Sequence, residues 1–206
     1  MELILYTNPM SRGRMARWML EEIGAPYRTE IIEYGPPMKT PEYLAINPMG
    51  KVPALRHGDT VITETAAIIA YLADAFPDAG LAPAPGTPAR GRYYRWLFFT
   101  AGPFEAAVMD SSLKVEVPPE RAGMIGYGSL KLVLDTLEKT LARGPYLLGE
   151  AFSAADIYLG AQIGFGLRFN TIEARPGFAD YAQRLFSRPA AQRAAGMDDA
   201  LMPPKA

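Results

Sequence analysis

The stretch Leu3–Ile32, LILYTNPMSRGRMARWMLEEIGAPYRTEII, carries the pattern that decides the fold. Its short apolar run Leu3–Tyr6 predicts a buried strand, and Tyr27–Ile32 predicts a second one. Between them, residues of one apolar helical face recur every four positions and indicate a helix that begins at Ser11 and ends before Gly24. These apolar residues are Met15, Met19 and Ile23. A strand, a helix and a strand at this spacing form a βαβ unit, so we expect the two strands to be parallel.

Short predicted helices and strands continue up to residue 77. Thr40-Pro41-Glu42 has the residues of a helix start, and Asn47-Pro48 stops that short helix. Val52–Arg56 and Thr60–Ile62 flank a glycine turn, which predicts a hairpin. A last helix is expected after Thr63, with Ile68, Leu72 and Phe76 on its apolar face. The predicted order is β-α-β-α-β-β-α, a mixed sheet with helices packed on it.

The second half of the chain is predicted to be all helical. Residues 78–88 are rich in proline, glycine and alanine, and we interpret them as a linker. Beyond them, apolar residues are spaced by three and four, and no strand pattern follows. The predicted helices contain residues 93–98, 127–141, 153–165 and 176–187. We expect them to form a bundle over 89–206, with a loose tail from Met202 on.

Composition and charge exclude several classes of function. The formal net charge of −1 argues against a whole-surface grip on nucleic acid. The chain has no cysteine, which removes thiolate metal sites and any protein thiol nucleophile and fits a reducing cytosol. The single histidine, His57, argues against a zinc enzyme or a Ser–His–Asp hydrolase. With no signal-peptide pattern and no apolar run that could span a bilayer, we expect a cytoplasmic protein without a metal.

The run Asn47–Pro53 is the first of three local features that bear on chemistry. Pro53 opens a strand, where its missing N–H is tolerated, and an X–Pro bond is where a cis peptide costs least. A cis bond between Val52 and Pro53 would turn the N–H and C=O of Val52 outward. An extended peptide-like ligand could then pair with these groups as an added strand. The alternative is an ordinary turn proline.

The second feature is the pair Glu64-Thr65 at the start of a predicted helix. The free N–H groups and the partial positive charge of a helix N-terminus suit a carboxylate. The Thr65 hydroxyl adds a donor, and the Glu64 carboxylate would suit an ammonium group. These groups together describe a site for the α-amino-acid end of a ligand, and simple helix capping is the alternative.

The third feature is Ser11-Arg12-Gly13-Arg14. Ser11 is a natural N-cap residue. Arginines at a helix N-terminus oppose the helix dipole at a cost of about a few tenths of a kcal/mol, which indicates that an anion visits this end. The alternative is that the arginines pair with surface acids such as Glu22 or Glu30.

Together these features resemble the cytosolic glutathione S-transferase family, in a bacterial, serine-type form. The matching segments are Asn47–Leu55, Glu64-Thr65 with Ala66–Asp74, and Phe152–Ile157. The resemblance covers nearly the whole chain and implies a thioredoxin-like, glutathione-binding domain over 1–77. It also implies that an all-α C-terminal domain over 89–206 lines the site of the second substrate. Ser153 and Asp156 resemble the capping box of that domain, so Asp156 is expected to act in folding.

The resemblance implies an enzyme that conjugates the glutathione thiolate to small hydrophobic electrophiles. Glutathione would be a substrate, no cofactor would be tightly bound, and the protein would be a homodimer that acts in detoxification. The implied roles can be stated by part of the tripeptide. Val52 would pair with the cysteinyl part beside a cis Pro53, Glu64 and Thr65 would hold the γ-glutamyl end, and Lys39 and Lys51 would hold the glycine carboxylate, with Arg12 also among the binding residues. Threonine at position 65 departs from the commoner serine but keeps the hydroxyl.

Activation of the sulfur is assigned to Ser11. A free thiol with a pKa of about 8.5 is mostly protonated at neutral pH, and the thiolate is the nucleophile. A hydroxyl that donates to a charged acceptor contributes about 1.5–3 kcal/mol, which lowers the thiol pKa by roughly one to two. Ser11 aligns with the serine or cysteine of the non-tyrosine classes. Tyr6, at the end of the first strand, is the competing assignment, and Asn8 could assist either.

The second substrate is expected between the two domains. Residues of the long helix after the linker are the candidates for its pocket, because aromatic and methionine side chains suit a loose apolar site. They are Tyr93, Trp96, Phe104 and Met109. A glutathione-dependent isomerase, dehalogenase or peroxidase of the same fold is one alternative function, and a non-catalytic glutathione- or ligand-binding protein is another.

Overall fold

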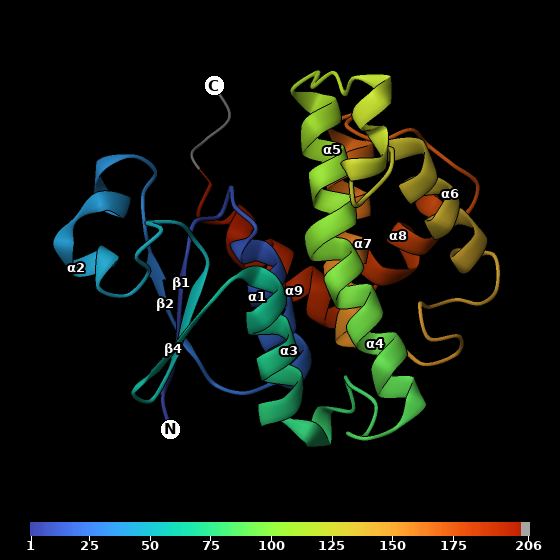
Figure 1. The fold of residues 1–206 in the computed structure, drawn as a ribbon. Coiled ribbons are helices and arrows are strands. Elements are labelled where there is room, and N and C mark those ends of the chain that lie inside the picture. The colour runs from blue at the N-terminus through green and yellow to red at the C-terminus, as the bar shows by residue number, and fades with distance from the viewer. Residues whose placement is uncertain (203–206) are drawn as a thin grey trace. The chain divides into compact units, whose positions relative to one another are not determined.

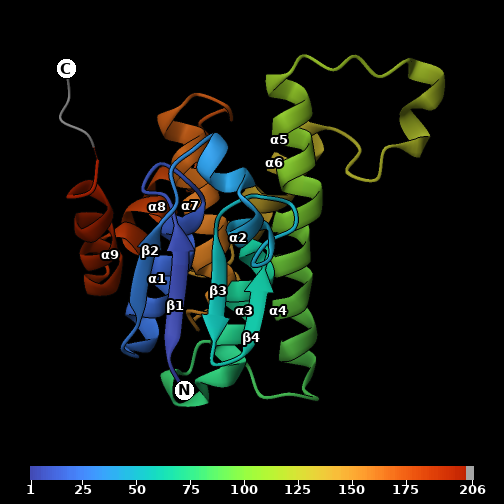
Figure 2. The same cartoon turned by 90° about the vertical axis from the view of Figure 1, so that its left-hand side faces the viewer.

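The structure is a computed structural model that describes residues 1–202 and divides into two compact units (Figures 1 and 2). Of the described residues, the first unit holds Met1–Ala79 and those from Ser187 to Met202, and the second holds Gly80–Phe186. The tail expected to be loose lies, from residue 203 on, outside the described residues. Among the helices of residues 1–202, none has the length and apolar character needed to cross a membrane.

A four-stranded mixed sheet forms the centre of the first unit, in the order β2-β1-β3-β4. The strands are β1 (Leu3–Thr7), β2 (Arg28–Ile31), β3 (Ala54–His57) and β4 (Thr60–Thr63). β1 pairs in parallel with β2 and antiparallel with β3, and β4 pairs antiparallel with β3. The predicted βαβ unit and hairpin are therefore confirmed. The helices between Met1 and Ala79 are α1 (Gly13–Ile23), the 3₁₀ helix Pro36–Lys39, α2 (Pro41–Leu44), α3 (Thr65–Ala75) and the 3₁₀ helix Pro77–Ala79. Together with the sheet they form a thioredoxin-like arrangement.

Short-range signals set the ends of these helices. Gly24 ends α1 with a φ of 68°, in the left-handed region that glycine enters without the steric cost of a side chain. Thr40 caps α2, because its Oγ1 accepts a hydrogen bond from the Tyr43 N–H at 3.3 Å, and Pro41 follows at the first helical position. Helix α1 packs on β1 and α3, with Met15 and other apolar residues of one face buried.

Helix α9 (Pro189–Asp199) is absent from the sequence prediction, and it belongs to the first unit. The expected helical domain, 89–206, therefore differs from the second unit, which ends at Phe186. α9 packs along α1 (Figure 1). Its buried apolar residues are all alanines, namely Ala190, Ala191 and Ala194. Alanine permits a close approach of two helices, but it is only weakly apolar. The periodic spacing of apolar residues is therefore weak in this segment, which explains why the sequence did not predict the helix.

The regular secondary-structure elements of the second unit are all helices. They are α4 (Pro88–Phe99), the π-helical segment Thr100–Phe104, α5 (Glu105–Ser112), the 3₁₀ helix Pro119–Met124, α6 (Leu130–Leu141), α7 (Ala154–Arg168) and α8 (Phe178–Phe186). The long helix expected after the linker is interrupted by the π-helical segment, which contains Pro103. Proline has no N–H to donate to the preceding turn, so regular α-helical bonding cannot continue through it.

The capping box predicted at the start of α7 is confirmed. Ser153 and Asp156 exchange the two hydrogen bonds of that motif, with the Ser153 N–H donating to Asp156 Oδ2 at 2.9 Å. Asp156 is fully buried, and its Oδ1 also accepts from the Leu147 N–H at 2.8 Å and from the Tyr181 hydroxyl at 2.9 Å. Burial raises the pKa of this carboxyl. These contacts tie the start of α7 to α8 and to the loop before α7, which is a role in folding.

Candidate functional site

Two side chains hold the loop Asn47–Pro53 in place: Tyr43 of α2 and Asn47, the first residue of the loop itself. The Tyr43 hydroxyl donates to the carbonyl oxygen of Lys51 at 2.6 Å, and Asn47 Nδ2 donates to the same oxygen at 2.7 Å. Asn47 Oδ1 accepts from the Met49 N–H at 3.1 Å. The peptide bond between Val52 and Pro53 is cis, as the family resemblance implies. The path of the chain into β3 is thus fixed by buried side chains.

Val52 presents open backbone groups at the end of this loop. Neither its N–H nor its C=O makes a hydrogen bond to any group of residues 1–202. The residue is half-buried, and its side chain packs against a core cluster that includes Tyr6, Tyr43 and Ala54. Unpaired backbone donors and acceptors at a strand entrance are the groups that pair with an extended peptide.

The two predicted lysines differ in their surroundings. Lys39 Nζ donates to the carbonyl oxygens of Met49 and Gly50, at 3.0 and 3.3 Å, so it braces the loop. Lys51 is exposed, and its ammonium group has no partner among residues 1–202. Gly50 has a φ of 57°, and a Cβ there would lie 2.6 Å from the Met38 carbonyl oxygen and 2.7 Å from Lys39 Nζ. Glycine is therefore required at position 50, next to the hydrogen bonds that Lys39 donates to the loop.

Glu64 and Thr65 form the N-terminus of α3, as predicted. Glu64 has a φ of 68° and a ψ of 120°, a backbone conformation that is rare and strained for a residue with a side chain. Its exposed carboxylate makes no capping hydrogen bond and no ion pair within the described chain. Thr65 is 8% exposed and is the first residue of the helix. Backbone strain of this kind is found most often at active sites and ligand-binding sites. The role of Glu64 and Thr65 at a ligand stays a prediction.

Ser11 lies in the turn between β1 and α1. The helix begins at Gly13, with Arg12 in the cap position, and the Gly13 N–H donates to Ser11 Oγ at 2.9 Å. The Ser11 hydroxyl in turn donates to the Asn8 carbonyl oxygen at 2.7 Å. Asn8 is buried, and its Nδ2 donates to the Ile32 carbonyl oxygen at 3.1 Å, which ties the turn to the end of β2. Whether it assists at the sulfur stays a prediction.

The remaining residues predicted around the sulfur lie in distinct settings. Tyr6 is 7% exposed, and its hydroxyl has no hydrogen-bond partner within residues 1–202. Arg12 is exposed at the surface. Arg14 pairs with Asp199 at 2.6 Å and also donates to the Pro9 carbonyl oxygen, and its acidic partner is thus in α9 instead of being Glu22 or Glu30. The choice between Ser11 and Tyr6 stays a prediction.

The predicted electrophile-pocket residues all lie in the second unit. Tyr93, Trp96 and Phe104 are 0%, 3% and 2% exposed, and Met109 is 42% exposed. Three of the four therefore have the burial of core side chains. The role of these residues at a second substrate stays a prediction.

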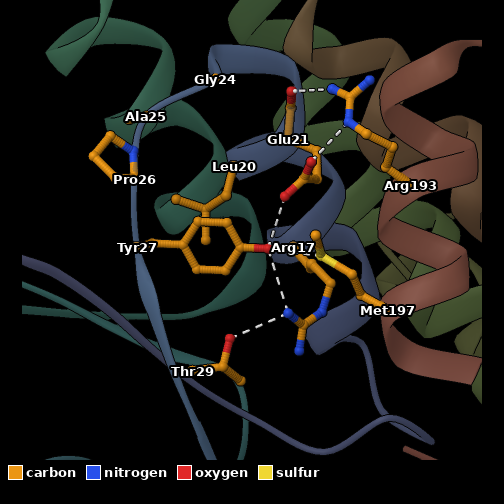
Figure 3. A pocket seen from close by; sticks show the side chains of 10 residues that line it. All are labelled: Arg17, Leu20, Glu21, Gly24, Ala25, Pro26, Tyr27, Thr29, Arg193 and Met197. Atoms are coloured by element: carbon orange, nitrogen blue, oxygen red, sulfur yellow. Dashed lines mark hydrogen bonds and ion pairs between the residues drawn. The ribbon is translucent and has the colours of Figure 1, made fainter. Parts of the chain in front are cut away.

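A cavity of about 650 Å³ lies elsewhere in the first unit, between α1, the start of β2 and α9 (Figure 3). It is lined by Arg17, Leu20, Glu21, Gly24, Ala25, Pro26, Tyr27, Thr29, Arg193 and Met197. Arg193 donates to Glu21 within the cavity, and Arg17 donates to the Tyr27 and Thr29 hydroxyl groups while it pairs with Asp198, which does not line the cavity. None of the predicted glutathione-binding residues lines it.

Sequence reasoning missed Tyr43 and Asn47, which hold the loop that carries Val52. Tyr43 was available as the aromatic residue of the short helix, and Asn47 as the residue that stops it. No local pattern shows that both side chains reach back to the Lys51 carbonyl, because that contact depends on how the loop folds over α2.

The sheet order, the proline loop before β3 and the attached helical unit define a thioredoxin-like protein with an all-α second part. Residues 10–75 match the family model of the glutathione S-transferase N-terminal domain, and residues 126–184 match that of the C-terminal domain. The chain is 30% identical over 166 residues to glutathione S-transferase 3 of Zea mays, across 75% of each protein. The chain therefore belongs to the glutathione S-transferase family. Its relatives named glutathione S-transferase support a glutathione transferase enzyme.

Solved structures agree with this assignment. A glutathione transferase from Methylococcus capsulatus superposes with a TM-score of 0.79 at 32% identity, over 96% of this chain and 99% of that one. A sphingomonad glutathione S-transferase complexed with glutathione superposes with a TM-score of 0.76 at 29% identity, over 95% of this chain and 98% of that one.

Proposed function

We propose that the protein binds glutathione along the loop before β3 and conjugates its thiolate to small hydrophobic electrophiles. The observation that carries this proposal is the unpaired backbone of Val52 on a loop braced by buried side chains. Glutathione is a tripeptide, so its cysteinyl N–H and C=O can complete the hydrogen bonds that Val52 lacks. The glutathione complex of the sphingomonad relative supports the choice of ligand.

The γ-glutamyl end of the ligand carries an ammonium and a carboxylate on one carbon. Glu64 offers an uncompensated carboxylate for the ammonium, and the start of α3 offers N–H groups and the Thr65 hydroxyl for the carboxylate. At the other end, the free ammonium of Lys51 is suited to the glycine carboxylate. Lys39 already donates hydrogen bonds to Met49 and Gly50, so it contributes its positive charge and holds the loop in place. Arg12, which is exposed, adds a further positive charge on the same unit.

Ser11 is the proposed donor to the sulfur, and its present hydrogen bond limits what it can contribute. A hydroxyl has one proton, which Ser11 now donates to the Asn8 carbonyl oxygen. Turning it to a thiolate replaces a neutral hydrogen bond of about 0.5–1.5 kcal/mol by a charged one of about 1.5–3 kcal/mol. The difference, roughly 1 kcal/mol or slightly more, lowers the thiol pKa by about one. The start of α1 adds up to roughly 1 kcal/mol, so much of the bound thiol ionises near neutral pH.

Titration calorimetry with glutathione, followed by turnover with a nitro-activated aryl halide, tests this proposal. We expect a heat of binding with glutathione and with S-methylglutathione, because the tripeptide backbone makes most contacts, but turnover with glutathione alone. Binding without turnover across several classes of electrophile would favour a binding protein. Turnover confined to isomerisation, dehalogenation or peroxide reduction would favour another enzyme of the same fold. Absence of binding would remove the proposal.

We further propose a homodimer and a cytoplasmic location, as the family resemblance implies. Light scattering coupled to gel filtration should give a mass of about twice the 22.5 kDa of the chain. A mass equal to that of the single chain would contradict the dimer.

A further inference from the structure

We infer that Tyr43 and Asn47 are positioning residues that set the direction of the Val52 N–H for a peptide ligand. This inference rests on the proposed function, because it concerns the same loop. It goes further by assigning part of the affinity for the tripeptide to two side chains that the ligand itself does not touch.

The geometry of one peptide plane carries the inference. The carbonyl oxygen of Lys51 has two lone pairs, and it accepts from the Tyr43 hydroxyl at 2.6 Å and from Asn47 Nδ2 at 2.7 Å. The peptide between Lys51 and Val52 is trans and planar, so its N–H points opposite to its C=O. Two donors on the carbonyl therefore fix the plane and aim the Val52 N–H away from both side chains.

The aimed N–H has no acceptor within residues 1–202. A backbone donor is normally paired, and a fixed one without a partner is set up to receive a ligand acceptor. Without the two donors the peptide plane could rotate, and binding would have to order it at an entropic cost. Preorganisation of this kind raises affinity without adding a contact to the ligand.

Both positioning side chains are rigidly held. Tyr43 is 3% exposed in the core cluster with Tyr6 and Ala54, and Asn47 is 2% exposed. Asn47 also accepts from the Met49 N–H through Oδ1, and its carbonyl accepts from the Gly50 N–H at 2.8 Å. Burial raises the pKa of Tyr43 to about 12, so its hydroxyl remains a donor throughout the neutral range.

The test compares Tyr43→Phe, which removes one donor and keeps the ring, with Tyr71→Phe as a matched control. The Tyr71 hydroxyl also makes a short side-chain hydrogen bond, 2.8 Å to His57 Nδ1, but it lies away from the loop. We expect Tyr43→Phe to raise the Kd and the KM for glutathione by roughly 3- to 10-fold, the equivalent of one hydrogen bond. The kcat at saturation and the pKa of the bound thiol should be unchanged, and Tyr71→Phe should leave the Kd as it is.

Asn47→Asp gives a second, independent readout. It keeps an oxygen for the Met49 N–H but replaces the Nδ2 donor by an acceptor that faces the Lys51 carbonyl. We expect a larger loss of glutathione affinity than for Tyr43→Phe, and a changed amide chemical shift of Val52 in the unliganded protein. Wild-type affinity in both variants, or an equal loss in Tyr71→Phe, would overturn the inference. Failure of the wild-type protein to bind glutathione would instead count against the proposed function.

Discussion

Arg17 of α1 and Asp198 of α9 form an ion pair inside the first unit, with Arg17 Nε donating to Asp198 Oδ1 at 2.9 Å. Their side chains are 4% and 0% exposed. Arg17 Nη1 also donates to the Tyr27 hydroxyl and to Thr29 Oγ1, at 3.3 and 3.1 Å. The pair joins the last described helix to the βαβ unit with which the chain begins. With the ion pairs Arg14–Asp199 and Arg193–Glu21, it helps to hold a helix of small residues on α1.

Removal of one partner of this pair should be worse than removal of both. Asp198→Ala leaves the Arg17 guanidinium buried without its counter-ion, at an expected cost of about 3–5 kcal/mol in the free energy of unfolding. A double replacement by apolar residues, Arg17→Met with Asp198→Leu, should recover much of that loss because no uncompensated charge remains. Urea denaturation of the wild-type protein and the two variants measures the difference. Equal destabilisation by the single and the double replacement would contradict this account.

Glu64 should show opposite effects on stability and on binding. Its φ of 68° with a ψ of 120° costs more for a residue with a Cβ than for glycine. Glu64→Gly is therefore expected to raise the free energy of unfolding by up to about 1–2 kcal/mol while it weakens glutathione binding. Glu64→Gln is the control, since it keeps the strain and removes only the charge.

Denaturant unfolding and calorimetry together separate the two effects of Glu64. The glutamine variant should lose affinity with nearly unchanged stability. If the glycine variant is less stable than the wild-type protein, the strain at this position has been misread. If the glutamine variant binds glutathione normally, the carboxylate does not hold the ligand ammonium.

Ser11→Ala should raise the pKa of bound glutathione by about one, because it removes the proposed donor to the thiolate. Turnover at pH 7 should fall several-fold and recover as the pH is raised, since the thiol then ionises without help. Thiolate absorbance of the binary complex, followed against pH, measures the shift. Tyr6→Phe serves as the comparison. An unaffected Ser11→Ala together with a crippled Tyr6→Phe would transfer the role to Tyr6.

Much of the first unit could be predicted because its signals are local. The apolar run of β1, the four-residue spacing of α1 and the glycine at its end each depend on neighbours in sequence. The same holds for the capping box of Ser153 and Asp156. Helix α9 could not be placed, because its alanines are weakly apolar and the Arg17–Asp198 pair joins residues far apart in the chain.

The site divides in the same way. Val52, Pro53, Glu64 and Thr65 could be singled out because a proline before a strand and an acid at a helix start are readable locally. The contacts that hold these residues in place could not be predicted, because the hydrogen bonds of Tyr43 and Lys39 join one segment of the chain to another. Tyr93 is buried and Met109 is exposed. This difference also depends on tertiary packing, which the spacing of apolar residues along the sequence does not predict.

The last prediction concerns alkaline pH and the cavity of Figure 3. Burial raises the pKa of Tyr27 to about 12, above the value of about 10 expected in the unfolded chain. Its hydroxyl donates to Glu21 Oε1 at 2.9 Å and accepts from Arg17 Nη1. Because the folded protein holds this proton more tightly, the stabilising contribution is complete below about pH 10 and is lost as the pH rises towards about 12.

Tyr27→Phe has no proton to lose, so its free energy of unfolding should depend less on pH between about 10 and 12 than that of the wild-type protein. Below pH 10 the variant should be modestly less stable, because Glu21 and Arg17 each lose a hydrogen-bond partner. Urea unfolding at a series of pH values gives both quantities. Tyr43, whose pKa is also raised to about 12, remains in the variant and keeps part of the alkaline dependence. Parallel stability curves for the two proteins over this range would show that Tyr27 ionises as easily in the folded chain as in the unfolded one.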